Sequence, residues 1–146
     1  PKLLTRMAGP DQPDLVIGSR WVPGGRINGW SHKRVALSKA GNYYVRFCLG
    51  TPVRDATAGL RLHRAAFLQD NDVLDRVATT GFGFQVEMTE LERSLGAVIA
   101  EVPITFDERI AGESKLDSSI FVEELVMVTK GGLGRVTQAA RRAFSK

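Results

Sequence analysis

The sequence has 146 residues, 43% of them hydrophobic, and a formal net charge of +4, which suits one globular domain with a buried core. The positive charge favours partners that carry phosphate groups, without choosing among nucleotides, nucleic acids and anionic lipids. A single cysteine, Cys48, excludes a framework of internal disulfides and is expected to be a small buried apolar residue. No apolar run in the sequence has the length of a membrane-spanning helix, and contact with a membrane surface stays open.

The first expected strand follows a proline-containing start. Residues 1–13 are expected to form the end of a helix and a loop. Residues 14–20 (DLVIGSR) then have the pattern of a strand buried on both faces of a parallel sheet. Ligands of open α/β sheets bind beyond the carboxyl ends of the strands, where Arg20 would lie. Arg20 is therefore a candidate binding residue, and a solvated arginine at a strand end is the alternative.

A glycine-rich loop and a capped helix come next. Residues 21–30 (WVPGGRINGW) are expected to be a mobile loop, because Gly24–Gly25 and Asn28–Gly29 both permit positive φ angles. Ser31 can cap the helix that follows, which is expected to run to about Leu49 and to end at a glycine.

Two features of this helix concern its surroundings. Arg34 and Ser38 are four residues apart and share a face, so a cation and a hydroxyl could hold one anion. A plain solvent-exposed face is the alternative. The latter half, residues 43–49, is apolar nearly all round and is therefore expected to be buried or to rest on another apolar surface.

Two further segments carry polar side chains. Residues 60–64 alternate leucines with Arg61 and His63, as in an exposed or edge strand. His63 is not expected to bind zinc, because no second histidine or cysteine lies at the spacing of a zinc ligand. A helix is expected from about residue 85 to Gly96. Glu87 would lie in its first turn, where a carboxylate interacts favourably with the helix dipole, and a catalytic role is the alternative.

The segment that ends the patterned part of the chain is a strand followed by a charged loop. Residues 98–106 are apolar and β-branched, and residues 107–115 (DERIAGESK) place Gly112 between Arg109 and Lys115. A planar guanidinium and a mobile ammonium suit a clamp on a diphosphate, and the glycine suits a lid that orders when that ligand binds. An ordinary charged surface loop is the alternative.

Five segments in this order resemble one known family. They are DLVIGSRWVPGG, WSHKRVALSKAGN, PVRDATAGLRLHR, GFGFQVEM and EVPITFDERIAGESK. Together they resemble the second half of the polyprenyl-phosphate mannosyltransferases, the inverting GT-A glycosyltransferases that include dolichol-phosphate-mannose synthases. The resemblance implies an α/β fold, the C-terminal part of a Rossmann-like GT-A domain with flanking helices. It assigns residues 1–130 to the catalytic domain, and the stripe pattern predicts a basic amphipathic helix at residues 131–146.

The resemblance also implies roles for residues already singled out. Mannose would pass from GDP-mannose to the phosphate of a polyprenol lipid, and Arg20 would contact both donor and acceptor phosphate. Arg34 and Ser38 would hold the lipid phosphate, and with Arg20 they form the implied catalytic set. Arg109 and Lys115 would close over the donor diphosphate. The attacking phosphate is ionised at neutral pH, so no side chain has to act as a base.

Further expectations concern orienting residues, metal and partners. Asp55 and Glu87 are candidates to orient the sugar or Arg20, and FDER has Glu108 where the family more usually has Asp. The implied metal is Mg²⁺ or Mn²⁺, with its Asp-x-Asp ligands expected upstream of this chain, so the chain is expected to lack the metal site and not to transfer mannose alone. The implied partners are the cytoplasmic face of a membrane and a membrane-anchoring or acyltransferase-type protein, but no nucleic acid.

The sequence leaves two rival functions open. A relative that transfers glucose or another sugar to the same lipid phosphate would share the anion-binding residues. A non-enzymatic protein that binds phosphate or nucleic acid is the rival of a different class, and it predicts stacking aromatic residues interleaved with a basic face. For the fold, we expect one or two parallel strands and an edge strand flanked by helices, with an open sheet edge that favours association.

Overall fold

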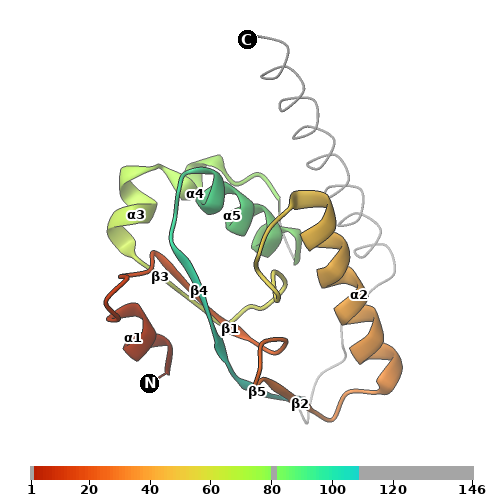
Figure 1. The fold of residues 1–146 in the computed structure, drawn as a ribbon. Coiled ribbons are helices and arrows are strands. Elements are labelled where there is room, and N and C mark those ends of the chain that lie inside the picture. The colour runs from red at the N-terminus through yellow and green to blue at the C-terminus, as the bar shows by residue number, and fades with distance from the viewer. Residues whose placement is uncertain (1, 80–81, 109–146) are drawn as a thin grey trace.

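A mixed three-stranded sheet lies at the centre of the fold (Figure 1). The computed structural model describes residues 2–79 and 82–108. Strand β1 (Leu15–Ser19) lies between β3 (Arg61–His63), to which it is antiparallel, and β4 (Ile99–Pro103), to which it is parallel. The predictions of a buried parallel strand at residues 14–20 and of an edge strand that includes His63 are confirmed.

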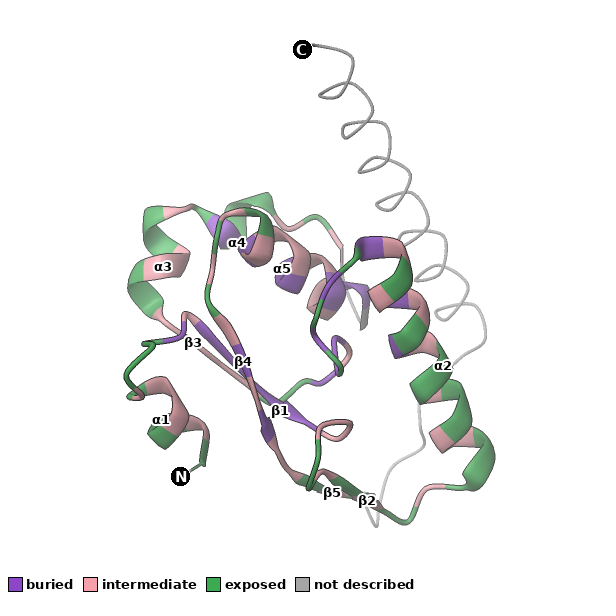
Figure 2. Ribbon diagram, in the orientation of Figure 1, coloured by how far each residue is buried: buried purple, intermediate pink, exposed green. Residues whose placement is uncertain are grey.

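All five residues of β1 are buried, because both faces of the strand are covered (Figure 2). Side chains alternate across a strand, so Leu15 and Ile17 lie on one face and Val16 on the other. Val16 packs with residues of β4 and of helix α1 (Lys2–Met7). Leu15 and Ile17 belong to the larger core, whose other buried members are Val45, Leu49, Val53, Ala56, Ala58 and Val86. Burial of each leucine, isoleucine or valine side chain in this core contributes about 1.5–3 kcal/mol. The buried strand in turn fixes the position of the residue that follows it.

Helix α2 (His32–Leu49) has the predicted ends. The Ser31 hydroxyl caps it by accepting a hydrogen bond from the backbone N–H of Arg34, and Gly50 ends it in the left-handed conformation, with φ of 56°. Of the two expectations for the latter half, burial does not hold for Tyr43 and Phe47, whose exposed fractions are 67% and 89%, and contact with another apolar surface stays a prediction. The helix packs on the sheet through one face, so its outer face stays uncovered by the described residues.

The glycine-rich segment contains a strand that the sequence does not predict. Strand β2 (Arg26–Asn28) pairs in parallel with β5 (Thr105–Asp107), which follows β4 almost directly. The expectation of a loop is therefore wrong for these three residues. It is correct about the glycines, because Gly24 and Gly29 have φ angles of 88° and 86°.

Three helices complete the described fold: α3 (Ala65–Asp70), α4 (Val73–Arg76) and α5 (Phe82–Ser94). Helix α5 begins earlier than predicted, so Glu87 lies beyond its first turn and the first-turn placement is wrong. The residues around β3 differ in their exposure. Leu60 is the exposed residue, and Arg61 reaches toward α5 through a hydrogen bond to Thr89.

The sheet has open edges in the part of the chain that the structure describes. Strands β3 and β4 each pair with β1, and neither has a second partner among residues 2–79 and 82–108. Association through these edges stays a prediction. In the same ranges, no helix is both long and apolar enough to cross a membrane. The expected amphipathic helix at residues 131–146 lies outside the described residues.

Candidate functional site

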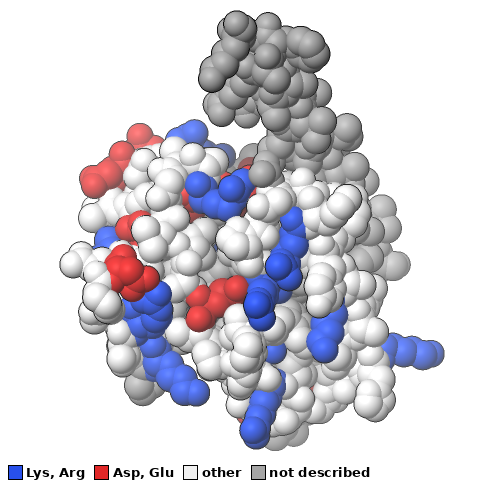
Figure 3. Space-filling view, in the orientation of Figure 1, with Lys and Arg blue, Asp and Glu red and all other residues white. Residues whose placement is uncertain are grey.

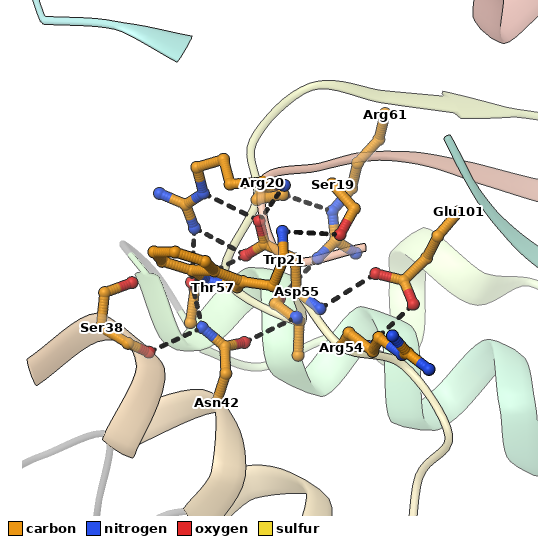
Figure 4. Close-up of polar contacts among 12 residues, drawn as sticks. Ser19, Arg20, Trp21, Ser38, Asn42, Arg54, Asp55, Thr57, Arg61 and Glu101 are labelled. Carbon is orange, nitrogen blue, oxygen red and sulfur yellow. Dashed lines mark hydrogen bonds and ion pairs between the residues drawn. The ribbon is translucent and has the colours of Figure 1, made fainter. Parts of the chain in front are cut away.

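Arg20 directly follows β1, and a buried carboxylate holds it (Figure 4). Asp55, which is fully buried, accepts hydrogen bonds from Arg20 Nε at 2.8 Å, from Nη2 at 2.6 Å and from the backbone N–H at 2.8 Å. Arg20 Nη2 also donates to Thr57 Oγ1 at 3.0 Å. The Arg20 side chain is 10% exposed, so the solvated arginine considered as the alternative is not what the structure contains.

The loop that carries Asp55 is held from two sides. On one side, Glu101 of β4 accepts hydrogen bonds from the backbone N–H groups of Arg54 at 2.8 Å and Asp55 at 3.0 Å. On the other side, buried Asn42 of α2 accepts from the backbone N–H of Ala56 at 2.9 Å. Strand β4 and helix α2 thus fix the carboxylate that fixes Arg20.

Trp30 brings the second predicted arginine to the first. The Arg34 guanidinium lies over the Trp30 ring with its Cζ 4.2 Å from the ring centroid, and Arg20 Cζ lies 5.3 Å from the same centroid. Phe106 of β5 packs edge-on against Trp30, with 5.5 Å between ring centroids. Two cations that are distant in the sequence therefore share one indole, and cation–π attraction offsets part of their mutual repulsion.

Arg34 also has a carboxylate partner. Its Nη1 forms an ion pair with Oε1 of Glu108, the residue that follows β5. Ser38 lies one helical turn from Arg34 and one turn from Asn42, whose side chain donates to the Ser38 carbonyl at 2.9 Å. Figure 4 shows Ser38 on the side of α2 that faces Arg20 and Thr57. The predicted shared face of Arg34 and Ser38 is thus turned toward the site.

Several buried N–H groups around the two arginines have no acceptor among the described residues. They are Trp21 Nε1, Trp30 Nε1 and Arg34 Nε. Buried donors are nearly always paired, so an unmet cluster of them indicates that an acceptor from outside the described chain belongs nearby.

A third arginine ties the Asp55 loop to α5. Arg61 donates to the carbonyl groups of Ala56 at 2.6 Å and Ala58 at 2.8 Å. Burial lowers the pKa of Arg61 to about 10, although the charges of Glu92 and Asp55 raise it, so Arg61 stays protonated at neutral pH. Its partners are structural, and it extends the network that holds Asp55 in place.

Glu87 has no contact with this cluster in the described structure. Its carboxylate accepts hydrogen bonds from the backbone of Ala78 and from the backbone and hydroxyl of Thr79, the latter at 2.8 and 2.5 Å. Burial by itself would raise the pKa of Glu87, but these hydrogen bonds outweigh it and the pKa is lowered. Glu87 thus fastens α5 to the preceding segment. Arg109 and Lys115 lie outside the described residues.

Five residues of this arrangement were not predicted as site residues: Trp30, Asn42, Thr57, Glu101 and Glu108. A buried asparagine in the middle of a helix and a glutamate within an apolar strand are signals that polar contacts exist there. Such signals do not identify the partner of a polar side chain, because partners can be distant in the sequence. Arg34 and Glu108, for example, are separated by 74 residues.

A divalent metal ion needs several His, Cys, Asp or Glu ligands close together. No group of three or more His, Cys, Asp or Glu within the described residues could hold a metal ion. On the face in Figure 3, basic side chains are interspersed with acidic ones and form no continuous basic stripe.

Comparison with known proteins identifies relatives. No protein-family model matches the sequence. Over 120 residues, which are 82% of this chain and 49% of the relative, it is 50% identical to an undecaprenyl-phosphate mannosyltransferase of Micrococcus luteus. Over 127 residues, 86% of this chain and 48% of the relative, it is 42% identical to a polyprenol monophosphomannose synthase of Mycolicibacterium smegmatis.

The chain thus spans about half the length of the curated relatives it matches. Identity of this order over most of the chain confirms the resemblance read from the five sequence segments. Across the residues that are matched, the chain is thus similar to polyprenyl-phosphate mannosyltransferases.

Proposed function

We propose that this chain forms the acceptor-phosphate side of a GT-A enzyme that transfers mannose from GDP-mannose to polyprenyl phosphate. The observation that carries the proposal is the meeting of Arg20 and Arg34 at Trp30, beside buried N–H groups that lack an acceptor. A phosphate monoester has the charge and the number of oxygen atoms that such a cluster can bind. The names of both relatives support mannose as the transferred sugar.

The proposed reaction is a direct displacement. An oxygen of the lipid phosphate attacks the anomeric carbon of mannose, the new carbon–oxygen bond forms on one face, and the bond to the GDP oxygen breaks on the other. The phosphate is already ionised, so no proton has to be removed from it. The work left to the protein is to hold two anionic groups together in line, which is positioning and electrostatic stabilisation.

Arg20 suits this task because it cannot easily reorient. Its guanidinium is held by the buried carboxylate of Asp55, which is itself held by β4 and α2. A charge that is fixed before the substrate arrives needs no reorganisation during the reaction. We assign Arg34 and Ser38 to the acceptor phosphate, and Arg109 and Lys115 to the donor diphosphate.

No role assigned here to a residue of this chain depends on the implied metal. Mg²⁺ or Mn²⁺ would neutralise charge on the leaving diphosphate when bound. The described residues do not fit such an ion, since they contain no cluster of three suitable ligands. The steps proposed for this chain therefore use its arginines, Lys115 and the Ser38 hydroxyl.

Helix α2 supports a lipid as the owner of the phosphate. Its inner face carries Arg34 and Ser38, and its outer face exposes Leu37, Tyr43 and Phe47. A polyprenol phosphate held at Arg34 would leave its hydrocarbon chain close to this apolar face, which could lie against a bilayer surface. We therefore place the protein at the cytoplasmic face of a membrane, in peripheral contact.

Nucleic-acid binding is the weaker alternative. Single-stranded nucleic acids bind on exposed aromatic rings beside a basic groove. Trp30 instead packs against two arginines and Phe106, and so offers less free ring face for a base. Transfer of glucose or another sugar would use the same phosphate site, and no described residue favours it.

Binding of a short acceptor tests the phosphate site. Farnesyl phosphate, a soluble polyprenyl monophosphate, is titrated into the 146-residue chain by calorimetry, with farnesol as the ligand that lacks the phosphate. Arg34→Ala and Ser38→Ala should each weaken binding by roughly fivefold to a hundredfold, the equivalent of about 1–3 kcal/mol for a hydrogen bond to a charged group. Lys33→Ala, an exposed lysine on the same helix, is the control and should change little. Unchanged affinity in Arg34→Ala would contradict the acceptor assignment.

Transfer is tested separately. The matched half of the Micrococcus luteus relative is replaced by this chain, and the hybrid is incubated with GDP-mannose, undecaprenyl phosphate and Mg²⁺ or Mn²⁺. The proposal expects mannosyl lipid from the hybrid and none from its Arg20→Ala variant. Transfer from a different nucleotide sugar, with none from GDP-mannose, would favour the alternative sugar.

A further inference from the structure

Glu108 reaches Arg34 because a pair of short strands brings it there. In the β2–β5 pair Asn28 lies opposite Asp107, and the backbone N–H of Glu108 donates to the Asn28 carbonyl at 3.1 Å. Asn28 Nδ2 also donates to Asp107 Oδ1 at 2.6 Å. Gly29 leaves room for this approach, since a Cβ atom there would lie 2.9 Å from the Cβ of Glu108. The backbone therefore fixes the root of the Glu108 side chain beside α2.

The Arg34 guanidinium is held on its face and at one corner. Trp30 covers the face, with 4.2 Å between Arg34 Cζ and the ring centroid, and Glu108 accepts from Nη1. Arg34 Nε is buried and has no acceptor in the described structure. A carboxylate that satisfied the whole fork would accept two parallel N–H bonds, one from each of two nitrogens. Glu108 thus accepts from Nη1 of the Arg34 guanidinium and leaves the Nε side of that group for another anion.

We propose that Glu108 is a positioning residue for Arg34. Together with Trp30 it fixes the guanidinium plane so that the Nε side meets an oxygen of a phosphate monoester. The inference rests on the proposed function, in which Arg34 binds the acceptor phosphate. It adds that Glu108 supports phosphate binding as the acceptor for Arg34 Nη1, although its carboxylate lies near a second negative charge.

The opposite role is an internal competitor, in which the Glu108 carboxylate occupies the place of the phosphate. A competitor would have to leave before the ligand binds, and its removal would tighten binding. The unmet Nε donor argues against this role, because the position that a phosphate would use is not the one that Glu108 fills. The two roles therefore predict effects of opposite sign.

The size of the effect follows from exposure. The side chains of Arg34 and Glu108 are 27% and 40% exposed, so solvent screens their attraction. Pairs of this kind change an equilibrium by up to about fivefold, which corresponds to about 1 kcal/mol at 25 °C. We therefore expect a modest but measurable change in affinity.

The test uses farnesyl phosphate and the full 146-residue chain in calorimetric titrations. Glu108→Ala should weaken binding by about threefold to fivefold, because Arg34 loses the partner at Nη1. Glu108→Gln keeps an acceptor oxygen at that corner and should bind within about twofold of the unaltered chain. Tighter or unchanged binding by Glu108→Ala would overturn the proposal, and tighter binding would establish the competitor.

Two controls separate positioning from damage to the fold and from an effect that does not pass through Arg34. Asp107→Ala removes the neighbouring carboxylate, which contacts Asn28 rather than Arg34, and should leave the affinity unchanged. Equal losses in Asp107→Ala and Glu108→Ala would overturn the proposal, since they would reflect a disturbed strand end. In the Arg34→Ala background, Glu108→Ala should cause no further loss, and an additional loss would show that Glu108 does not act through Arg34.

The proposed function fails in a different way. If the unaltered chain does not bind farnesyl phosphate, or if Arg34→Ala binds it equally well, the acceptor site itself is wrong. If Arg34→Ala loses affinity while Glu108→Ala does not, only the positioning role of Glu108 is wrong.

Discussion

The pair of Arg20 and Asp55 shows how a single residue is prepared for a charged ligand. Removing both charges from water is costly, and replacing such a buried pair by apolar residues often costs nothing. The structure offsets the cost with three hydrogen bonds that Arg20 donates to the carboxylate and two that the backbone N–H groups of the loop donate to Glu101. The pair is therefore better explained by the need to hold a cation in one place than by stability.

Replacing Asp55 by alanine should destabilise the fold strongly. The change leaves the Arg20 guanidinium, whose side chain is 10% exposed, without its carboxylate partner. The expected loss in the free energy of unfolding is about 3–5 kcal/mol, measured by urea denaturation. Asp11→Ala breaks an exposed ion pair with Arg6 and serves as control, with little change expected. Equal midpoints for Asp55→Ala and Asp11→Ala would contradict the assigned strength of the buried pair.

Glu87 should make stability depend on pH. Its pKa is lowered in the folded chain, so its contribution is present above the ordinary pKa of the carboxyl group and is lost as the pH falls through the lowered value. Glu87→Gln should therefore lower the unfolding midpoint at about pH 7 and should differ less from the unaltered chain at about pH 3. A difference that grows toward acid pH would mean that the hydrogen bonds from Thr79 and Ala78 do not stabilise the ionised form.

At the level of elements, patterns of neighbouring residues predicted the buried strand β1 and both ends of helix α2. The short, mostly apolar run at residues 15–19 predicted the strand, and all five of its residues are buried. Ser31 begins α2 because its hydroxyl can cap the helix, and Gly50 ends it because its backbone adopts the left-handed conformation. The β2–β5 pair could not be predicted, since each strand has three residues and its partner lies far away in the chain. The contacts that complete the site depend on this pair. The spacing of Arg34 and Ser38 thus indicated a shared face, but not the Glu108 that meets it.

Gly29 tests the importance of the β2–β5 pair. Alanine there would need a φ of 86° and would bring its Cβ to 2.9 Å from the Cβ of Glu108. We expect a loss of more than about 1–2 kcal/mol, the usual cost of the left-handed conformation, measured as a change in the free energy of unfolding.

Two other glycines separate the causes of that loss. Gly96 has a φ of 89° with nothing within 4 Å of a Cβ, and Gly59 has neither a positive φ nor a near contact. Gly96→Ala should show the conformational cost alone, and Gly59→Ala should show neither cost. Equal losses for Gly29→Ala and Gly96→Ala would mean that the contact with Glu108 is not tight.

For the whole molecule, α2 connects two surfaces of different character. Its inner face belongs to the proposed phosphate site, through Arg34, Ser38 and Asn42, and its outer face exposes Leu37, Tyr43 and Phe47. Lys39 and Arg46 lie over the rings of Trp21 and Tyr43 and keep positive charge close to the helix. An apolar face with basic residues beside it is the arrangement of a helix that lies on an anionic membrane.

This arrangement predicts that the chain binds vesicles that contain phosphatidylglycerol, and that added salt weakens the binding. Phe47→Ser should weaken it by roughly tenfold or more, because transfer of one large apolar side chain contributes about 1.5–3 kcal/mol. Leu74→Ser, which removes another exposed apolar side chain on α4, is the matched control and should have no effect. The measurement is co-sedimentation over a range of lipid concentrations. Equal effects of the two substitutions would show that exposed apolar residues act without regard to position, and that the outer face of α2 is not the membrane contact.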